Sequence, residues 1–146
     1  MPMTVTINMD KEAALKRFQQ ATWKLGRSTV ASSPLVYNMQ ADAEETADYG
    51  LMDAMYGEWW EKGVHEVSEF VTEHDGTSVT LELPSRWAGS RAALKYALGE
   101  LLHNGMLGDW YDDVKQDVAT AFKKKAVLNQ AEIRAIVYSV NPPSME

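Results

Sequence analysis

The stretch that decides the fold is residues 81–111, LELPSRWAGSRAALKYALGELLHNGMLGDWY. Its first residues complete an alternation of apolar and polar side chains that begins at Ser78, which is the pattern of a strand with one buried face. Pro84 lacks a backbone N–H and therefore ends that strand. Beyond Pro84 the apolar residues recur every three or four positions, so the stretch predicts a strand followed directly by a helix.

The helix predicted after Pro84 has a recognisable start and stop. Ser85 or Ser90 offers an N-cap, because a serine hydroxyl accepts a hydrogen bond from a free N–H of the first helical turn. We expect a helix of about five turns that is closed by Asp109–Trp110–Tyr111, and Asn104–Gly105 offers a stop because this pair tolerates the left-handed conformation that commonly ends a helix. Its apolar stripe consists of Leu94, Leu98, Leu101 and Leu102.

The longest helix is expected before this stretch, from about Ala43 to Val71, where apolar residues keep helical spacing. Gly50, Gly57 and Gly63 fall inside it. Each glycine costs about 1 kcal/mol relative to alanine in a helix interior, so each predicts a close helix contact or a bend. Asp75–Gly76 then predicts a turn.

Nearer the N-terminus, the alternating residues Thr4–Ile7 predict a short strand, and we expect it to pair with Ser78–Leu83. Asp10 follows as an N-cap. It begins a predicted helix that runs to about Leu25, with Gly26 as the stop.

A last long helix is expected after Asp109, which is itself a candidate N-cap. Val114, Val118, Phe122 and Ala126 keep helical intervals along it. Asn129–Gln130 could interrupt it, and the β-branched residues of Ile133–Val140 leave helix and strand open there.

These elements predict one mainly α domain over residues 1–146. It is a small bundle of about four helices with a minor two-stranded β element. At this length one core is large enough to need no covalent staples. We also expect a long loop at about 27–42, where the chain is serine-rich and lacks periodicity, and a flexible C-terminal tail at about 141–146.

Composition excludes several classes of function. The 14 basic and 21 acidic residues give a formal net charge of −7, which opposes the phosphate neutralisation that drives nucleic-acid binding. The chain has no cysteine, which excludes disulfides, thiolate catalysis and cysteine-ligated zinc or iron–sulfur sites. Neither a signal peptide nor a membrane span of about 18 apolar residues is recognisable, so we expect a soluble protein without a membrane partner.

Candidate chemistry is sparse. Glu100 and His103 have the i, i+3 spacing of half a di-iron bundle motif, but no second copy accompanies them. We interpret the four aspartates after Gly108 as helix-start residues and Lys123–Lys125 as a solvated helix face. The four aspartates are Asp109, Asp112, Asp113 and Asp117. Tyr49, Trp59, Trp60 and Trp87 are expected to fill the core. We therefore expect no catalytic residue, no metal ligand and no cofactor.

One family resemblance rests on the order of these pieces. Leu83–Pro84 precedes a helix, the run Leu94–Gly108 ends in Asp109–Trp110–Tyr111, an Ala- and Lys-rich last helix follows, and Pro142–Pro143 lies in the tail. In this order the chain resembles the small head-tail connector, or neck adaptor, proteins of tailed bacteriophages and prophages of gut bacteria. The resemblance covers roughly Asp53–Pro143, and the tail differs from the family pattern in being poor in Arg and Lys.

The resemblance implies a structural, non-enzymatic virion protein. A ring of identical copies would join the portal to the tail in the neck of the virion, after assembly in the host cytoplasm. Its partners would be other copies of the chain, the portal protein and tail or neck proteins, while DNA passes through the ring without specific binding. A heterologous ring contact needs two different faces on each subunit. The interface candidates are Pro34, Leu35, Val36, Tyr37, Val140, Pro142 and Pro143.

Two alternatives stay open from the sequence. One is a non-catalytic regulatory module that binds a partner through the aromatic and methionine residues. The other is a metal-dependent helical-bundle enzyme that uses Glu100 and His103 together with carboxylates from the Glu58–Glu69 segment.

Overall fold

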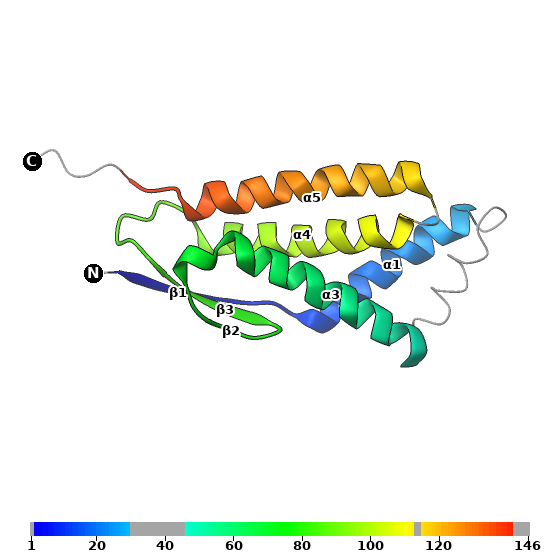
Figure 1. The fold of residues 1–146 in the computed structure, drawn as a ribbon, viewed down its shortest axis with the longest axis horizontal. Coiled ribbons are helices and arrows are strands. Elements are labelled where there is room, and N and C mark those ends of the chain that lie inside the picture. The colour runs from blue at the N-terminus through cyan, green and yellow to red at the C-terminus, as the bar shows by residue number, and fades with distance from the viewer. Residues whose placement is uncertain (1, 30–45, 113–114, 142–146) are drawn as a thin grey trace, which may run out of the picture.

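The computed structural model describes residues 2–29, 46–112 and 115–141, with side chains for all of these except 23–29 and 46–50. Within this part the fold is mainly helical with a small antiparallel sheet, as predicted (Figure 1). The elements in chain order are β1 (Met3–Asn8), α1 (Lys11–Thr29), α3 (Thr46–Glu66), the short 3-10 helix η1 (Ser68–Phe70), β2 (Val71–His74), β3 (Ser78–Leu83), α4 (Arg91–Tyr111) and α5 (Gln116–Val137).

The sheet has three strands in the order β1-β3-β2, one more than predicted. The expected pairing of the first strand with Ser78–Leu83 is confirmed, with Val5 opposite Leu81 and Ile7 opposite Val79. The third strand, β2, begins at Val71, the last residue that helical spacing had assigned to the central helix, and extends to His74. That helix, α3, ends at Glu66 instead.

A local turn after β2 accounts for the hairpin. The carboxylate of Asp75 accepts hydrogen bonds from the backbone N–H groups of Thr77 and Ser78, both at 2.8 Å. This Asx-type turn joins β2 to β3 as a hairpin. The β-branched Val71 and Thr72 at the start of β2 also suit a strand better than a helix.

The α4 helix ends at Tyr111, in the predicted Asp109–Trp110–Tyr111 corner, and the stop offered by Asn104–Gly105 is wrong. A Cβ on Gly105 would lie 2.1 Å from Cδ2 of Trp59, so glycine is needed here to admit the indole and not to end the helix. The indole N–H of Trp59 donates to Asp109 at 2.7 Å. Asp109 therefore lies inside α4 and ties it to α3, instead of capping the last helix.

The other helix ends agree only partly with the sequence. Asp10 caps α1 by accepting from the N–H of Ala13 at 3.0 Å, and Ser90 caps α4 by accepting from Ala93 at 3.3 Å. The expected stop at Gly26 is wrong, since α1 runs to Thr29 and takes the first three residues of the predicted loop. The remainder of that loop, residues 30–42, lies outside the described residues, as do tail residues 142–146.

The last helix, α5, passes through Asn129–Gln130 without interruption and ends at Val137. The open choice at Ile133–Val140 is therefore settled as helix up to Val137. Beyond it, Val140 forms an isolated antiparallel bridge with Trp87.

The core lies between the sheet and the helices, with α4 packed against α3, α5, α1 and β1. Trp59, Trp60 and Trp87 are buried, as expected, while the side chain of Tyr49 lies outside the described set. Two of these indoles tie distant segments together. Trp60 donates to the carbonyl of Asp75 at 2.6 Å, and Trp87 donates to the carbonyl of Ile136 at 2.8 Å.

The helix glycines of α3 differ from one another. A Cβ on Gly63 would approach Leu98 to 2.9 Å, which confirms a close contact with α4. Gly57 has no atom within 4 Å of the same position, so no close contact explains it, and the surroundings of Gly50 lie outside the described side chains. None of the described helices is both long and apolar enough to span a bilayer.

Candidate interaction groove on helices α1, α4 and α5

Only one of the seven predicted interface residues can be placed. Pro34, Leu35, Val36, Tyr37, Pro142 and Pro143 lie outside the described residues. Val140 is described and exposed, and it follows α5 at its bridge with Trp87. Backbone hydrogen bonds from Ala88 to Ser139 at 2.8 Å and from Asn141 to Arg86 at 2.7 Å fix this segment to the loop before α4.

The structure adds a groove that the sequence did not predict. It is a hollow of about 520 Å³ between α1, α4 and α5, and Arg17, Glu100, His103 and Asn104 are among the residues that line it. Two polar contacts cross it. Arg17 donates to Glu100 at 2.9 Å, joining α1 to α4, and the amide of Asn104 donates to Asn129 at 2.8 Å, joining α4 to α5.

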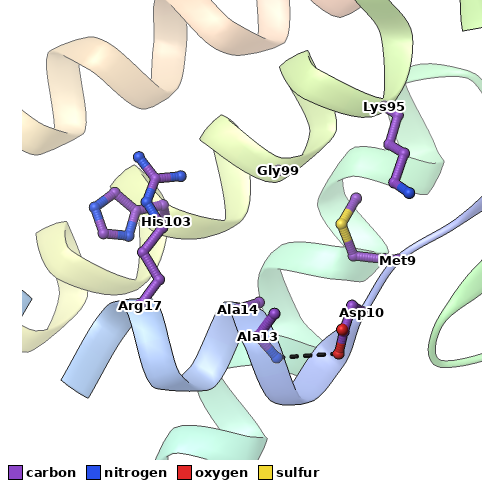
Figure 2. A pocket seen from close by; sticks show the side chains of 8 residues that line it. All are labelled: Met9, Asp10, Ala13, Ala14, Arg17, Lys95, Gly99 and His103. Carbon is purple, nitrogen blue, oxygen red and sulfur yellow. Dashed lines mark hydrogen bonds between the residues drawn. The ribbon is translucent and has the colours of Figure 1, made fainter. Parts of the chain in front are cut away.

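His103 lies on the wall of the groove, where Figure 2 shows its ring beside the guanidinium of Arg17. Burial, with a further contribution from the positive charge of Arg17, lowers the pKa of His103 from 6.5 to about 4. The imidazole is therefore neutral at pH 7. Its Nδ1 is buried without a hydrogen-bond partner among the described residues.

A smaller cavity of about 210 Å³ adjoins the groove between α1 and α4 (Figure 2). Arg17 and His103 line both spaces, and Met9 and Lys95 lie at the far end of the cavity. The carboxylate of Asp10 is occupied by its capping hydrogen bond to Ala13. Lys95 forms no ion pair with a described residue, so it leaves a positive charge at the edge of the cavity.

Exposed apolar side chains surround the groove. Tyr96 on α4 is 66% exposed, and Val127 and Leu128 on α5 are 62% and 68% exposed. Leu128 lines both the groove and a second hollow on the outer side of α5, which Val127 and Lys124 also line. The groove itself is lined mainly by polar side chains, among them the Arg17–Glu100 pair and Glu132, whereas the apolar side chains lie mostly at its α5 edge, beside Lys124 and Lys125.

The sequence contained a signal for part of this surface. The buried residues of α5 are Ala119, Ala126, Ile133 and Val137, which form one helical stripe. Val127 and Leu128 lie outside that stripe. The sequence alone therefore indicated an apolar pair on the solvent side of the helix. Of the three lysines interpreted as a solvated face, Lys123 pairs with Asp112, while Lys124 and Lys125 form no ion pair with a described residue.

The structure does not bring together the residues of the metal-enzyme alternative. Helix α3 packs on α4 at Leu98 and Leu101, through Gly63. Glu100 and His103 line the groove instead. At about 100° per residue, Glu100 lies roughly 200° around α4 from Leu98, so the carboxylates of α3 are on the opposite side of α4.

The aspartates after Gly108 also fail to converge. Asp109 bonds to Trp59, Asp112 pairs with Lys123, Asp117 is exposed in the first turn of α5, and Asp113 lies outside the described residues. Within the described ranges, no three His, Asp or Glu side chains are grouped as a metal ion would require.

The outer side of α3 differs chemically from the groove. Residues 51–82 contain eight acidic residues and one basic residue, Lys62. The exposed stripe of α3 consists of Leu51, Ala54, Glu58, Glu61 and His65, and we call it the α3 face. One side of α4 thus leads to the acidic segment, and the other side leads to a polar groove edged by exposed apolar side chains and by Lys124 and Lys125.

Comparison with known proteins gives no relative: no family model matches the chain, and neither does any curated protein or solved structure.

Proposed function

We propose that this chain is a structural, non-enzymatic subunit of a tailed-phage virion. It acts as a head-tail connector: identical copies form a ring in the neck and join the portal to the tail. The order of motifs in residues 53–143 supports this proposal through its resemblance to such proteins. The ring assembles in the host cytoplasm, and DNA passes through it without specific binding.

The observation that carries the proposal is the presence of two unlike surfaces on one small body. The groove side presents exposed apolar side chains and two lysines at the α5 edge of a polar hollow, and the α3 face presents the two carboxylates of Glu58 and Glu61. A ring of identical subunits is built from heterologous contacts, in which one face of each copy meets a different face of the next. A subunit with two chemically different faces on opposite sides of a central helix meets that requirement.

The packing between these surfaces also suits a structural subunit. A ring of identical subunits keeps a regular geometry only if each subunit is rigid. Here α4 is joined to α3 by the Trp59–Asp109 hydrogen bond and to α5 by Asn104–Asn129. Backbone hydrogen bonds hold the segment of the exposed Val140 against the loop before α4, which supports contact of this segment with a neighbouring neck protein.

Co-assembly with the portal tests this function. The full chain is mixed with the portal protein encoded in the same phage genome, and the complex is imaged by electron microscopy. The proposal expects a ring of this chain on one end of the portal. A portal that stays bare at saturating concentrations of the chain contradicts it and favours the regulatory-module alternative.

A further inference from the structure

We infer that the groove of one copy receives the α3 face of the next copy, an inference that rests on the proposed ring. The contact is head to tail. The groove side contributes Tyr96, Val127, Leu128, Lys124 and Lys125, and the α3 face contributes the stripe from Leu51 to His65.

One of the two surfaces is hollowed and the other is a helical ridge. The groove and the hollow beside it run over the exposed sides of α4 and α5 and meet at Leu128. The stripe of the α3 face follows i, i+3, i+7, i+10 and i+14 spacing, so it is one straight ridge along a helix. A helix laid in a groove between two other helices is a common docking mode.

Their chemistry is complementary as well. Leu51 and Ala54 form an apolar end of the stripe, and Leu51 is 46% exposed, as expected of a side chain that docking would bury. Glu58 and Glu61 supply the acidic end. On the groove side, exposed apolar residues lie beside Lys124 and Lys125, which have no ion-pair partner among the described residues. Two glutamates also line the groove: Glu100, which is paired with Arg17, and Glu132.

Charge distribution favours a second copy over an unrelated partner. The chain has a net charge of −7, and residues 51–82 alone contribute eight acids against one base. The α3 face of every other copy therefore supplies carboxylates, Glu58 and Glu61, that complement Lys124 and Lys125. Opposite charges facing each other also guide association and fix its register.

The existing ion pairs of the α3 face do not oppose docking. Glu58 pairs with Lys62 at 3.3 Å and Glu61 with His74 at 3.4 Å, and both carboxylates are more than half exposed. Exposed pairs of this kind contribute about 0–1 kcal/mol, so exchanging them for contacts with lysines of a neighbour costs little.

The absence of cysteine from the sequence allows a direct test. One variant carries Ala54→Cys on the α3 face and another carries Leu128→Cys in the groove. The two are mixed and treated with a short bismaleimide cross-linker. We expect cross-linked dimers in the mixture and at least tenfold less dimer with either variant alone. Ser85→Cys, exposed in the loop before α4, replaces Leu128→Cys in the matched control and is expected to cross-link at background level.

Charge reversal provides a second test. Lys124→Glu with Lys125→Glu is expected to weaken self-association at least tenfold in sedimentation velocity, and so is Glu58→Lys with Glu61→Lys. A mixture of the two double variants is expected to recover association, because each altered face then meets its complement. Lys16→Glu with Lys115→Glu changes the net charge equally at exposed or half-exposed positions outside the groove, and is the control.

The outcomes separate this inference from the proposed function. Cross-linking of Leu128→Cys to itself as efficiently as to Ala54→Cys overturns the head-to-tail contact, because it indicates a symmetric groove-to-groove dimer. If every one of these variants still forms rings on the portal, the proposed interface is wrong and the connector function stands. A chain that forms no ring with or without the portal overturns both.

Discussion

Replacing Gly105 by alanine tests the packing that sets the length of α4 and the position of α3. A Cβ at this site would lie 2.1 Å from Cδ2 of Trp59 and 2.5 Å from Cε2 and Cε3, far inside the carbon contact distance of about 3.5 Å. The indole cannot move freely, because its N–H is bound to Asp109 and the ammonium of Lys62 lies 3.9 Å above its ring centre.

The magnitude follows from three terms. Overpacking of a core costs about 2 kcal/mol, and losing the hydrogen bond from Trp59 to the Asp109 carboxylate costs about 1.5 kcal/mol. Alanine recovers about 1 kcal/mol of helix propensity over glycine. We therefore expect Gly105→Ala to lower the free energy of unfolding by about 2.5 kcal/mol and the Tm by about 8 °C.

Gly57→Ala is the matched control, because Gly57 is also inside a helix but has no atom within 4 Å of its Cβ position. It is expected to raise the free energy of unfolding by about 0.5–1 kcal/mol. Urea unfolding followed by far-UV circular dichroism and tryptophan fluorescence measures both variants. If Gly105→Ala is as stable as Gly57→Ala, Trp59 does not pack across Gly105 and the account of α4 is wrong.

Three further predictions concern single contacts. Because the pKa of His103 is about 4 in the folded chain and 6.5 in the unfolded chain, the unfolded state binds more protons between these pH values, so stability falls as the pH drops through this window. The imidazole ring is partly exposed, which reduces the expected loss of stability to about 1 kcal/mol. Urea titrations at pH 7 and pH 4.5 should show that the stability of His103→Gln changes less with pH than that of the unaltered chain. An equal change in both proteins would contradict the lowered pKa of His103. Asn104→Ala leaves the Asn129 amide without its partner and should lower the free energy of unfolding by about 1–3 kcal/mol, measured by thermal unfolding. In a double-mutant cycle with Asn129→Ala, the two losses should not add. Additive losses would show that the two amides do not interact. Asp10→Ala removes the N-cap bond to Ala13 and should cost about 1 kcal/mol, whereas unchanged stability would mean that the cap contributes nothing.

Local signals in the sequence predicted those parts of the fold that depend on neighbouring residues. The caps at Asp10 and Ser90 and the pairing of the first strand with Ser78–Leu83 each follow from a residue type and its immediate context. The Asp75–Gly76 turn was also predicted, although it closes a hairpin and does not end a helix.

Tertiary contacts decided the parts that the sequence missed. Asn104–Gly105 and Asp109 have the composition of a helix stop and a helix start, but Trp59 from α3 uses both Gly105 and Asp109 for packing. A pattern read along one helix cannot include an indole from another. The groove was missed for a similar reason, since it forms only when α1, α4 and α5 come together around His103.

The candidate groove, too, was predictable from the sequence only in part. Val127 and Leu128 were visible as an apolar pair off the buried stripe of α5, but their meeting with Tyr96 of α4 depends on how the two helices pack. The acidity of residues 51–82 is a property of the sequence alone. Its position across α4 from the groove required the contact of Gly63 with Leu98.

A native mass spectrum of the purified full chain, recorded alone and with the portal protein, tests the central claim most directly, because it reports both the number of copies and any bound metal. The account predicts a closed ring of metal-free copies, either in the free protein or on the portal. A chain that stays monomeric in both samples contradicts it, and a mass increment of one or two metal ions that disappears in His103→Ala would support the metal-enzyme alternative instead.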